Sequence, residues 1–342
     1  FKQKTAYEIS LGLVGSEMCI RDRIISVLAF VIIQLPEGDA ADRFLDRLMQ
    51  VGVSGDLRIA QELRSYLGLD EPMYVRYGMW IWNMAHGDLG RSIATWGETL
   101  NSQKPVKEVI GDRLYLTVVL TGFTILVTWT FAIPVGIYSA VRQHSIGDYT
   151  FTFLGFTGLA VPDFLLGLVL MYLAFAYFDQ SVGGLFSAKF INAPWTYSKV
   201  IDLINHLWIP AIVLGTSGTA GLIRVMRNNL LDELSKPYVV TGMAKGIKRS
   251  RLILKYPVRV AVNPLISTVG YLLPSLVGGS VIVSVVLSLP TLGPVLLDAI
   301  LIEDTQLAGF IVLMLGVLTV VGTLISDILL AIVDPRIKFT IR

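Results

Sequence analysis

Charged residues are scarce in this sequence. Asp, Glu, Lys and Arg make up only 16% of its 342 residues, whereas a soluble domain usually carries about 25%. Hydrophobic residues account for 54% of the chain, and the mean hydropathy is +0.65. This composition excludes an ordinary soluble domain and indicates a polytopic membrane protein.

Cysteine, histidine and the common catalytic motifs are also scarce. The one cysteine, Cys19, excludes an internal disulfide, and His86, His144 and His206 stand too far apart for zinc-ligand spacing. The chain has no G-x-x-x-x-G-K-[ST] phosphate loop and no G-x-S-x-G, H-E-x-x-H or C-x-x-C motif. We therefore expect no catalysis, no cofactor, no metal and no nucleic-acid partner for this chain.

Long apolar runs, in contrast, are abundant. A helix needs about 20 mostly apolar residues to cross a bilayer. Five runs reach or approach this length, namely 114–141, 151–178, 207–225, 264–289 and 307–333. A sixth run, 24–35, would cover only about 18 Å of a hydrocarbon core about 30 Å thick. Counting this short run, we predict an all-α fold with six transmembrane helices.

The segment before the short run breaks the apolar pattern with Glu17, Arg21, Asp22 and Arg23. Residues 1–23 resemble a translated sequencing-adapter artefact, so we interpret them as non-native and 24–35 as a truncated first transmembrane helix. The alternative is a genuine, poorly hydrophobic N-terminus. A genomic read across this junction would decide between the two.

Loop charges predict the orientation of the spans. Residues 224–259 hold nine basic residues and two acids, and the tail 334–342 holds three basic residues. By the positive-inside rule, these segments and the turn 142–149 are cytoplasmic, which places both termini inside. The acidic segment 290–306 and the long polar loop 36–113 are then external. Within that loop, DAADRFLDRLMQ and LRIAQELRSYLGL predict two short amphipathic helices.

Residues 239–257 (VVTGMAKGIKRSRLILKYP) carry five basic residues, no acid and two glycines. Pro237 suits the first turn of a short helix, where its missing N–H is not needed. Gly246 suits the end of that helix, because glycine takes the left-handed conformation at no steric cost. We predict two short helices joined by a bend, with an apolar side formed by Val239, Val240, Met243 and Ile247. Such a protrusion suits docking into a groove on a soluble partner; a solvated, positive-inside loop is the plainer alternative.

The sequence YVVTGMAKG, followed by Arg259 and Pro264, resembles the coupling motif of ABC importer permeases, Y-V-x-T-A-x-A-K-G. The matching coupling residues are Tyr238, Thr241, Ala244, Lys245 and Gly246. Three more stretches match the same family: LGLDEPMYVRYGMWIWNMAHGDLGRS, SLPTLGPVLLDAI and DILLAIVDPRI. Over residues 24–340 the chain therefore resembles the first permease of the dipeptide, oligopeptide and nickel importers.

This resemblance implies the type I ABC importer permease fold, with a five-helix core over 114–333 that includes a cytoplasmic coupling segment, 228–262. It also implies a bacterial inner-membrane assembly with a second homologous permease, two cytoplasmic ATP-binding subunits that hold ATP and Mg²⁺, and an extracytoplasmic solute-binding protein. The implied function is a translocation pathway for di- and oligopeptides. Nickel, glutathione or an oligosaccharide is the alternative substrate, and a stand-alone channel, a secondary transporter or an exporter is the alternative class.

A few charged residues lie within or at the ends of the apolar runs. Asp163 follows Pro162 inside an apolar run, and carboxylates within the membrane are costly and usually functional. We interpret Asp163 as a candidate pathway residue; the alternative is a carboxylate that is hydrogen-bonded to backbone freed by the proline. Asp327 is interpreted as structural, and Arg224 and Arg227 as markers of the inner membrane boundary.

The coupling segment departs from the family pattern at four positions. Gly242 stands where alanine is usual, Met243 replaces a common arginine, and Tyr256 and Pro257 replace histidine-alanine. We expect Pro257 to bend the second short helix.

Overall fold

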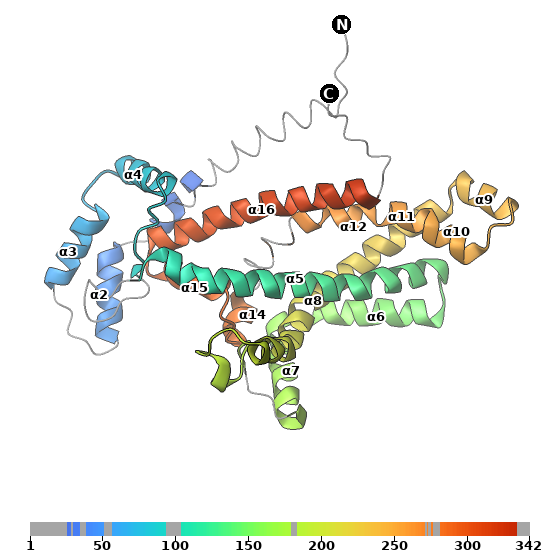
Figure 1. Cartoon of the computed structure of the whole chain (residues 1–342), viewed down its shortest axis with the longest axis horizontal. Coiled ribbons are helices and arrows are strands. Elements are labelled where there is room, and N and C mark those ends of the chain that lie inside the picture. Colours follow the sequence, from blue (N-terminus) through green and yellow to red (C-terminus); the bar gives the residue numbers. More distant parts are fainter. Residues whose placement is uncertain are drawn as a thin grey trace, which may run out of the picture. The chain divides into compact units, whose positions relative to one another are not determined.

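The computed structural model describes residues 26–28, 30–34, 39–50, 57–93, 104–178, 183–270, 272, 275 and 281–333. In these ranges the regular elements are helices, apart from one isolated antiparallel bridge between Arg91 and Pro105 (Figure 1). The predicted all-α fold is confirmed. The chain divides into two compact units, Phe1–Leu114 with Val295–Val317, and Tyr115–Pro294 with Leu318–Arg342.

The first unit contains the helices of the long polar loop. The two predicted amphipathic helices are present as α2 (Ala40–Gln50) and α3 (Leu57–Leu67), and a third helix, α4 (Met73–Ala85), follows them. The buried core under α2 and α3 includes Ala41, Phe44, Leu63, Ile93 and Ile302. Apolar side chains on one face of each short helix therefore form a small core of their own.

Asp304 holds the segments of the first unit together. It lies between α15 (Leu292–Leu301) and α16 (Thr305–Val333), and its side chain is fully buried. Its Oδ2 accepts hydrogen bonds from the Ser92 hydroxyl at 2.8 Å and the Ile93 amide at 2.7 Å, and its Oδ1 accepts one from the Leu307 amide at 3.0 Å. The carboxylate thus caps α16 and holds Ser92 and Ile93 beside the first turn of that helix.

We expect Asp304→Ala to destabilise the first unit by about 3 kcal/mol, because it removes charge-assisted hydrogen bonds and leaves buried donors without an acceptor. Thermal unfolding and limited proteolysis of the purified chain would measure the loss. Asp298→Ala is the matched control, since Asp298 is an exposed acid on the neighbouring α15. Equal stability of the two variants would contradict the assignment.

The second unit is built around one long helix, α8 (Tyr197–Leu234). It packs against α6 (Ile146–Ala160), α7 (Asp163–Phe178) and α11 (Pro257–Ala261). The helix α5 (Val106–Val141) comes close to it at Gly136, where an added Cβ would lie 2.7 Å from the Met226 Cβ. The remaining short helices are α9 (Pro237–Ala244), α10 (Arg249–Lys255), α12 (Asn263–Ser267), α14 (Val281–Val286) and the 3₁₀ turn η3 (Ala188–Phe190).

Three helices in the described residues are long and apolar enough to cross a membrane: α5, α8 and α16. The run 151–178, which we predicted as one span, is divided between α6 and α7, whose directions differ by 102°. The cause is Pro162, which pushes the preceding residue out of helical conformation; Val161 has φ −85° and ψ 125°. The pair α6 and α7 counts as a fourth span only if the bent pair crosses as one unit.

Several expected boundaries differ from the observed helices. α5 begins at Val106, within the predicted external loop, and α8 extends well beyond 207–225 at both ends. The runs 24–35 and 264–289 are described only in part, so the count of six spans stays a prediction. Residues 1–23 and the tail 334–342 lie outside the described residues.

Candidate functional site

The coupling segment forms two short helices joined by a bend. The first is α9, which begins with Pro237 in its first turn, and the second is α10. Gly246 lies in the left-handed region with φ +74°. Its amide donates to the Met243 carbonyl at 2.9 Å, and the Ile247 amide donates to the Gly242 carbonyl at 3.3 Å. This pair of bonds is the Schellman arrangement of a helix end, so the predicted helix start at Pro237 and helix end at Gly246 are confirmed.

α9 and α10 pack against each other through a glycine. A Cβ added at Gly242 would lie 2.5 Å from the Leu252 Cδ1, and Leu252 is buried. The glycine that replaces the family's usual alanine therefore permits a close contact between the two helices. Pro257 does not bend the second short helix as we expected: α10 ends at Lys255, and Pro257 begins a separate helix, α11. The contacts of α10 with α11, and of α11 with α8, anchor the coupling segment to the long helix.

The exposed side of α9 carries the motif. All five motif residues are exposed: Tyr238, Thr241, Ala244, Lys245 and Gly246. The expected apolar side is only partly right, because Val239 is buried whereas Val240 and Met243 are 58% and 49% exposed. Two exposed apolar side chains beside Lys245 give this side of α9 a mixed apolar and basic surface.

A groove of about 390 Å³ runs along this surface. Tyr238, Thr241 and Lys245 line it, together with Lys255 and Arg259 from the following helices. The sequence did not single out Lys255 as part of the site; its place in the groove depends on the turn after α9, which brings α10 back along α9. The groove is basic, so a partner with acidic side chains would complement it.

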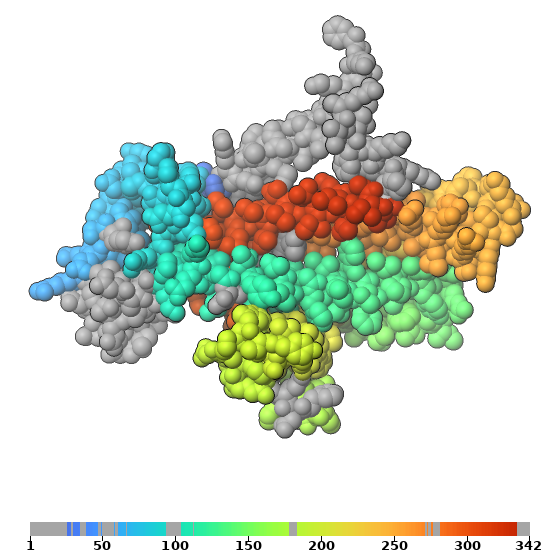
Figure 2. Space-filling view, in the orientation of Figure 1, coloured from blue at the N-terminus to red at the C-terminus, as the bar shows by residue number. Residues whose placement is uncertain are grey.

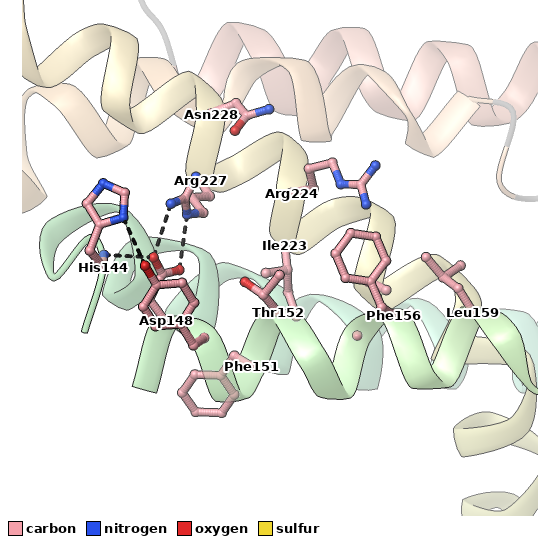
Figure 3. Close-up of a pocket in the computed structure, with 13 residues that line it drawn as sticks. His144, Asp148, Phe151, Thr152, Phe156, Leu159, Ile223, Arg224, Arg227 and Asn228 are labelled. Carbon is pink, nitrogen blue, oxygen red and sulfur yellow. Dashed lines mark hydrogen bonds and ion pairs between the residues drawn. The ribbon is translucent and has the colours of Figure 1, made fainter. Parts of the chain in front are cut away.

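An ion pair joins the first turn of α6 to the last third of α8. Asp148 Oδ1 accepts a hydrogen bond from Arg227 Nε, and its Oδ2 accepts one from the Arg227 NH2 group, both at 3.1 Å (Figure 3). Asp148 also accepts from the His144 amide at 3.0 Å, and its own amide donates to the Ser145 hydroxyl at 3.2 Å. The Asp148 side chain is only 4% exposed. Arg227 is therefore the main counter-charge of a buried carboxylate, a role that the sequence interpretation did not assign.

Asp163 is the first residue of α7 and is partly exposed. Its carboxylate has no hydrogen bond or ion pair with any residue that the structure describes. The hydrogen bond to freed backbone, which was the structural alternative, is thus not seen there. The carboxylate lies at a helix N-terminus, where the helix dipole favours a negative charge. A role in the pathway stays a prediction.

Comparison with known proteins identifies the family. The profile described as "Binding-protein-dependent transport system inner membrane component" matches residues 132–339, which include the coupling segment, Asp163 and the Asp148–Arg227 pair. The chain belongs to this family. The resemblance found in the sequence is confirmed, and the family has the type I ABC permease fold.

Individual proteins similar to this chain match it over nearly its whole length. The "Oligopeptide transport system permease protein AppB" of Bacillus subtilis (strain 168) is 38% identical over 317 residues, which cover 92% of this chain and 94% of the relative. The "Dipeptide transport system permease protein DppB" of Escherichia coli (strain K12) is 31% identical over 330 residues, with the same two coverages. A "Putative peptide permease protein" of Brucella ovis is 30% identical. Together with its apolar helices, these matches make the chain a multi-pass membrane permease subunit of an ABC transporter and not an enzyme.

The first unit carries a charged cluster formed by α2, α3 and the segment between α15 and α16. Arg64 donates to Asp39 at 2.6 Å and to Asp42, which ties α3 to the start of α2. Burial would raise the pKa of Asp39, but the hydrogen bonds from Arg64 and from the Asp42 amide outweigh it and hold that pKa below its usual value. Burial raises the pKa of Glu303 despite its ion pair with Arg43. These charges hold short helices together, and within the described residues no three His, Cys, Asp or Glu side chains form a metal site.

Proposed function

We propose that this chain forms half of the translocation pathway of an ATP-driven importer of di- and oligopeptides in a bacterial inner membrane. The observation that carries the proposal is the helix–bend–helix of the coupling segment, with its motif residues exposed and a basic groove beside them. This chain has no phosphate-binding loop of its own. We therefore propose that a partner subunit binds ATP and that its movement is passed on through this surface.

The proposed assembly has four kinds of subunit. A second homologous permease completes the pathway, and two cytoplasmic ATP-binding subunits dock on the coupling segments and hold ATP and Mg²⁺. An extracytoplasmic solute-binding protein delivers the substrate to the external side. Both termini of the chain lie in the cytoplasm, as the distribution of Lys and Arg in the short loops indicates. The peptide substrate is inferred from the printed names of the relatives.

Co-purification would test the proposal directly. The chain would be tagged at its C-terminus in its native host, extracted in mild detergent, and its companions identified by mass spectrometry. We expect a second permease and one or two ATPase subunits. A folded chain that comes out alone would contradict the proposal and favour a stand-alone channel or secondary transporter.

Asp163 provides a test of the pathway itself. We expect Asp163→Asn to lower dipeptide uptake about tenfold, because a carboxylate that meets the ammonium group of a peptide contributes more than a neutral hydrogen bond. Uptake of an N-acetylated dipeptide, which has no ammonium group, should change little. Asp327→Asn is the matched control, since Asp327 is an exposed carboxylate on α16. Unchanged uptake of the free dipeptide by Asp163→Asn would remove Asp163 from the pathway.

A further inference from the structure

A pocket of about 450 Å³ lies between α6 and α8, away from the coupling groove. Its lining includes Asp148, Phe156 and Leu159 from α6, and Arg224, Arg227 and Asn228 from α8. Figure 3 shows α6 and α8 side by side, with Arg227 reaching Asp148 across the space between them and Arg224 above Phe156. No step of the proposed transport cycle uses this pocket.

The pocket has a polar end and an apolar end. The polar end lies where α6 begins, at the Asp148–Arg227 pair and Asn228; the apolar end lies eleven residues further along α6, at Leu159 (Figure 3). Eleven residues of α-helix correspond to about 16 Å. A ligand that fills the pocket must therefore be amphiphilic, with a polar group at one end and an apolar body along the helix.

The charges in the pocket favour an anion. Asp148 already neutralises Arg227, because the two form a bidentate ion pair. The Arg224 guanidinium lies 4.9 Å from the centroid of the Phe156 ring and has no ion pair among the residues that the structure describes. One unneutralised positive charge is left, on a planar group that matches phosphate geometry.

The apolar wall favours a lipid over a protein segment. Phe156 is 52% exposed and Leu159 is 47% exposed, and the helix that carries them is part of a candidate membrane span. Side chains in that setting face acyl chains, and basic pockets between transmembrane helices bind anionic headgroups on the cytoplasmic side. The turn before α6 is on that side in the proposed orientation.

We propose that this pocket is a binding site for an anionic phospholipid. Arg224 binds the phosphate, the Asn228 amide offers a further hydrogen bond, and the first carbons of an acyl chain lie along Phe156 and Leu159. The Asp148–Arg227 pair forms the end wall of the pocket and is not itself a phosphate ligand.

The test uses the assembled, delipidated transporter, titrated with phosphatidylglycerol or phosphatidylcholine and followed by native mass spectrometry. We expect phosphatidylglycerol to bind preferentially, and Arg224→Gln to weaken its binding about tenfold or more, because a charge-assisted contact to phosphate is lost. Arg142→Gln is the matched control: Arg142 is an exposed arginine at the same end of the membrane region, outside the pocket. Arg224 is itself exposed, so its replacement should leave the thermal unfolding of the chain unchanged.

A second variant separates a lipid site from a site for free phosphate. Leu159→Asn should weaken phosphatidylglycerol binding without changing the affinity for inorganic phosphate. Three results would overturn the proposal: equal phosphatidylglycerol binding by wild type and Arg224→Gln, displacement of the lipid by inorganic phosphate at similar concentration, or no phosphatidylglycerol binding by the assembled transporter. The last result is expected if this face is a subunit interface instead.

Discussion

Replacing Gly246 with aspartate should abolish transport while the chain still folds and inserts. The φ of +74° at Gly246 costs a residue with a Cβ about 1–2 kcal/mol. Apart from its neighbours in the chain, no residue has a heavy atom within 4 Å of the position that a Cβ would take, so a Cβ there meets open space. The new carboxylate would lie on the exposed surface beside Lys245 and Lys248. It would reduce the positive charge there, which we expect acidic side chains of the ATPase subunit to recognise.

The measurement is uptake of a labelled dipeptide in cells that produce equal amounts of wild type and variant, with co-purification of the ATPase as a second readout. Gly246→Asn is the matched control, because asparagine tolerates the left-handed conformation and adds no charge. We expect this control to retain most of the transport activity. Wild-type uptake by Gly246→Asp would refute the coupling role of this turn.

Breaking the Asp148–Arg227 pair should be the most damaging change to stability in the second unit. Arg227→Gln leaves a carboxylate that is only 4% exposed without its counter-charge. Removing one partner of a buried ion pair costs about 3–5 kcal/mol. Asp148→Asn should cost less, because the half-buried guanidinium that it leaves can reach water; the Arg227 side chain is 24% exposed.

A double-mutant cycle would isolate the interaction. The variant Asp148→Asn with Arg227→Gln should be more stable than Arg227→Gln alone, since no charge is left uncompensated. Arg224→Gln, which removes the same charge one helical turn earlier without orphaning a carboxylate, is the control. Additive losses in the cycle would show that the two side chains do not interact in the membrane.

The sequence predicts those features of the fold that depend on neighbouring residues. Pro237 and Gly246 determine the start and end of α9 through their own backbone preferences, so both ends could be placed before the structure was known. The two amphipathic helices of the polar loop follow from the spacing of their apolar residues in the same way. Membership of the family could be recognised because its motifs are contiguous.

The features that sequence reasoning missed depend on residues far apart in the chain. Asp148 and Arg227 are separated by 79 positions, and Asp304 reaches Ser92 across 212. The residues next to Asp148, Arg227 and Asp304 in the sequence do not distinguish them from other charged residues outside the apolar runs. A count of acidic and basic residues treats all of these charges alike. The sequence indicated a kink at Pro162 but not its size, because hydropathy marks the whole run as one span and carries no information about the angle between the two helices.

The length of α8 has a mechanical consequence. Its 38 residues form a rod about 57 Å long, nearly twice the thickness of a hydrocarbon core. This helix is attached through α11 to the coupling segment. Its hydrogen-bonded turns resist compression, so a push at one end of the helix is transmitted to the other end. Pro210 lies inside it and removes one of those bonds, so the rod should flex there. If the coupling segment docks on an ATPase subunit as proposed, a small displacement at that end of α8 would reach the other end as a change of tilt at Pro210.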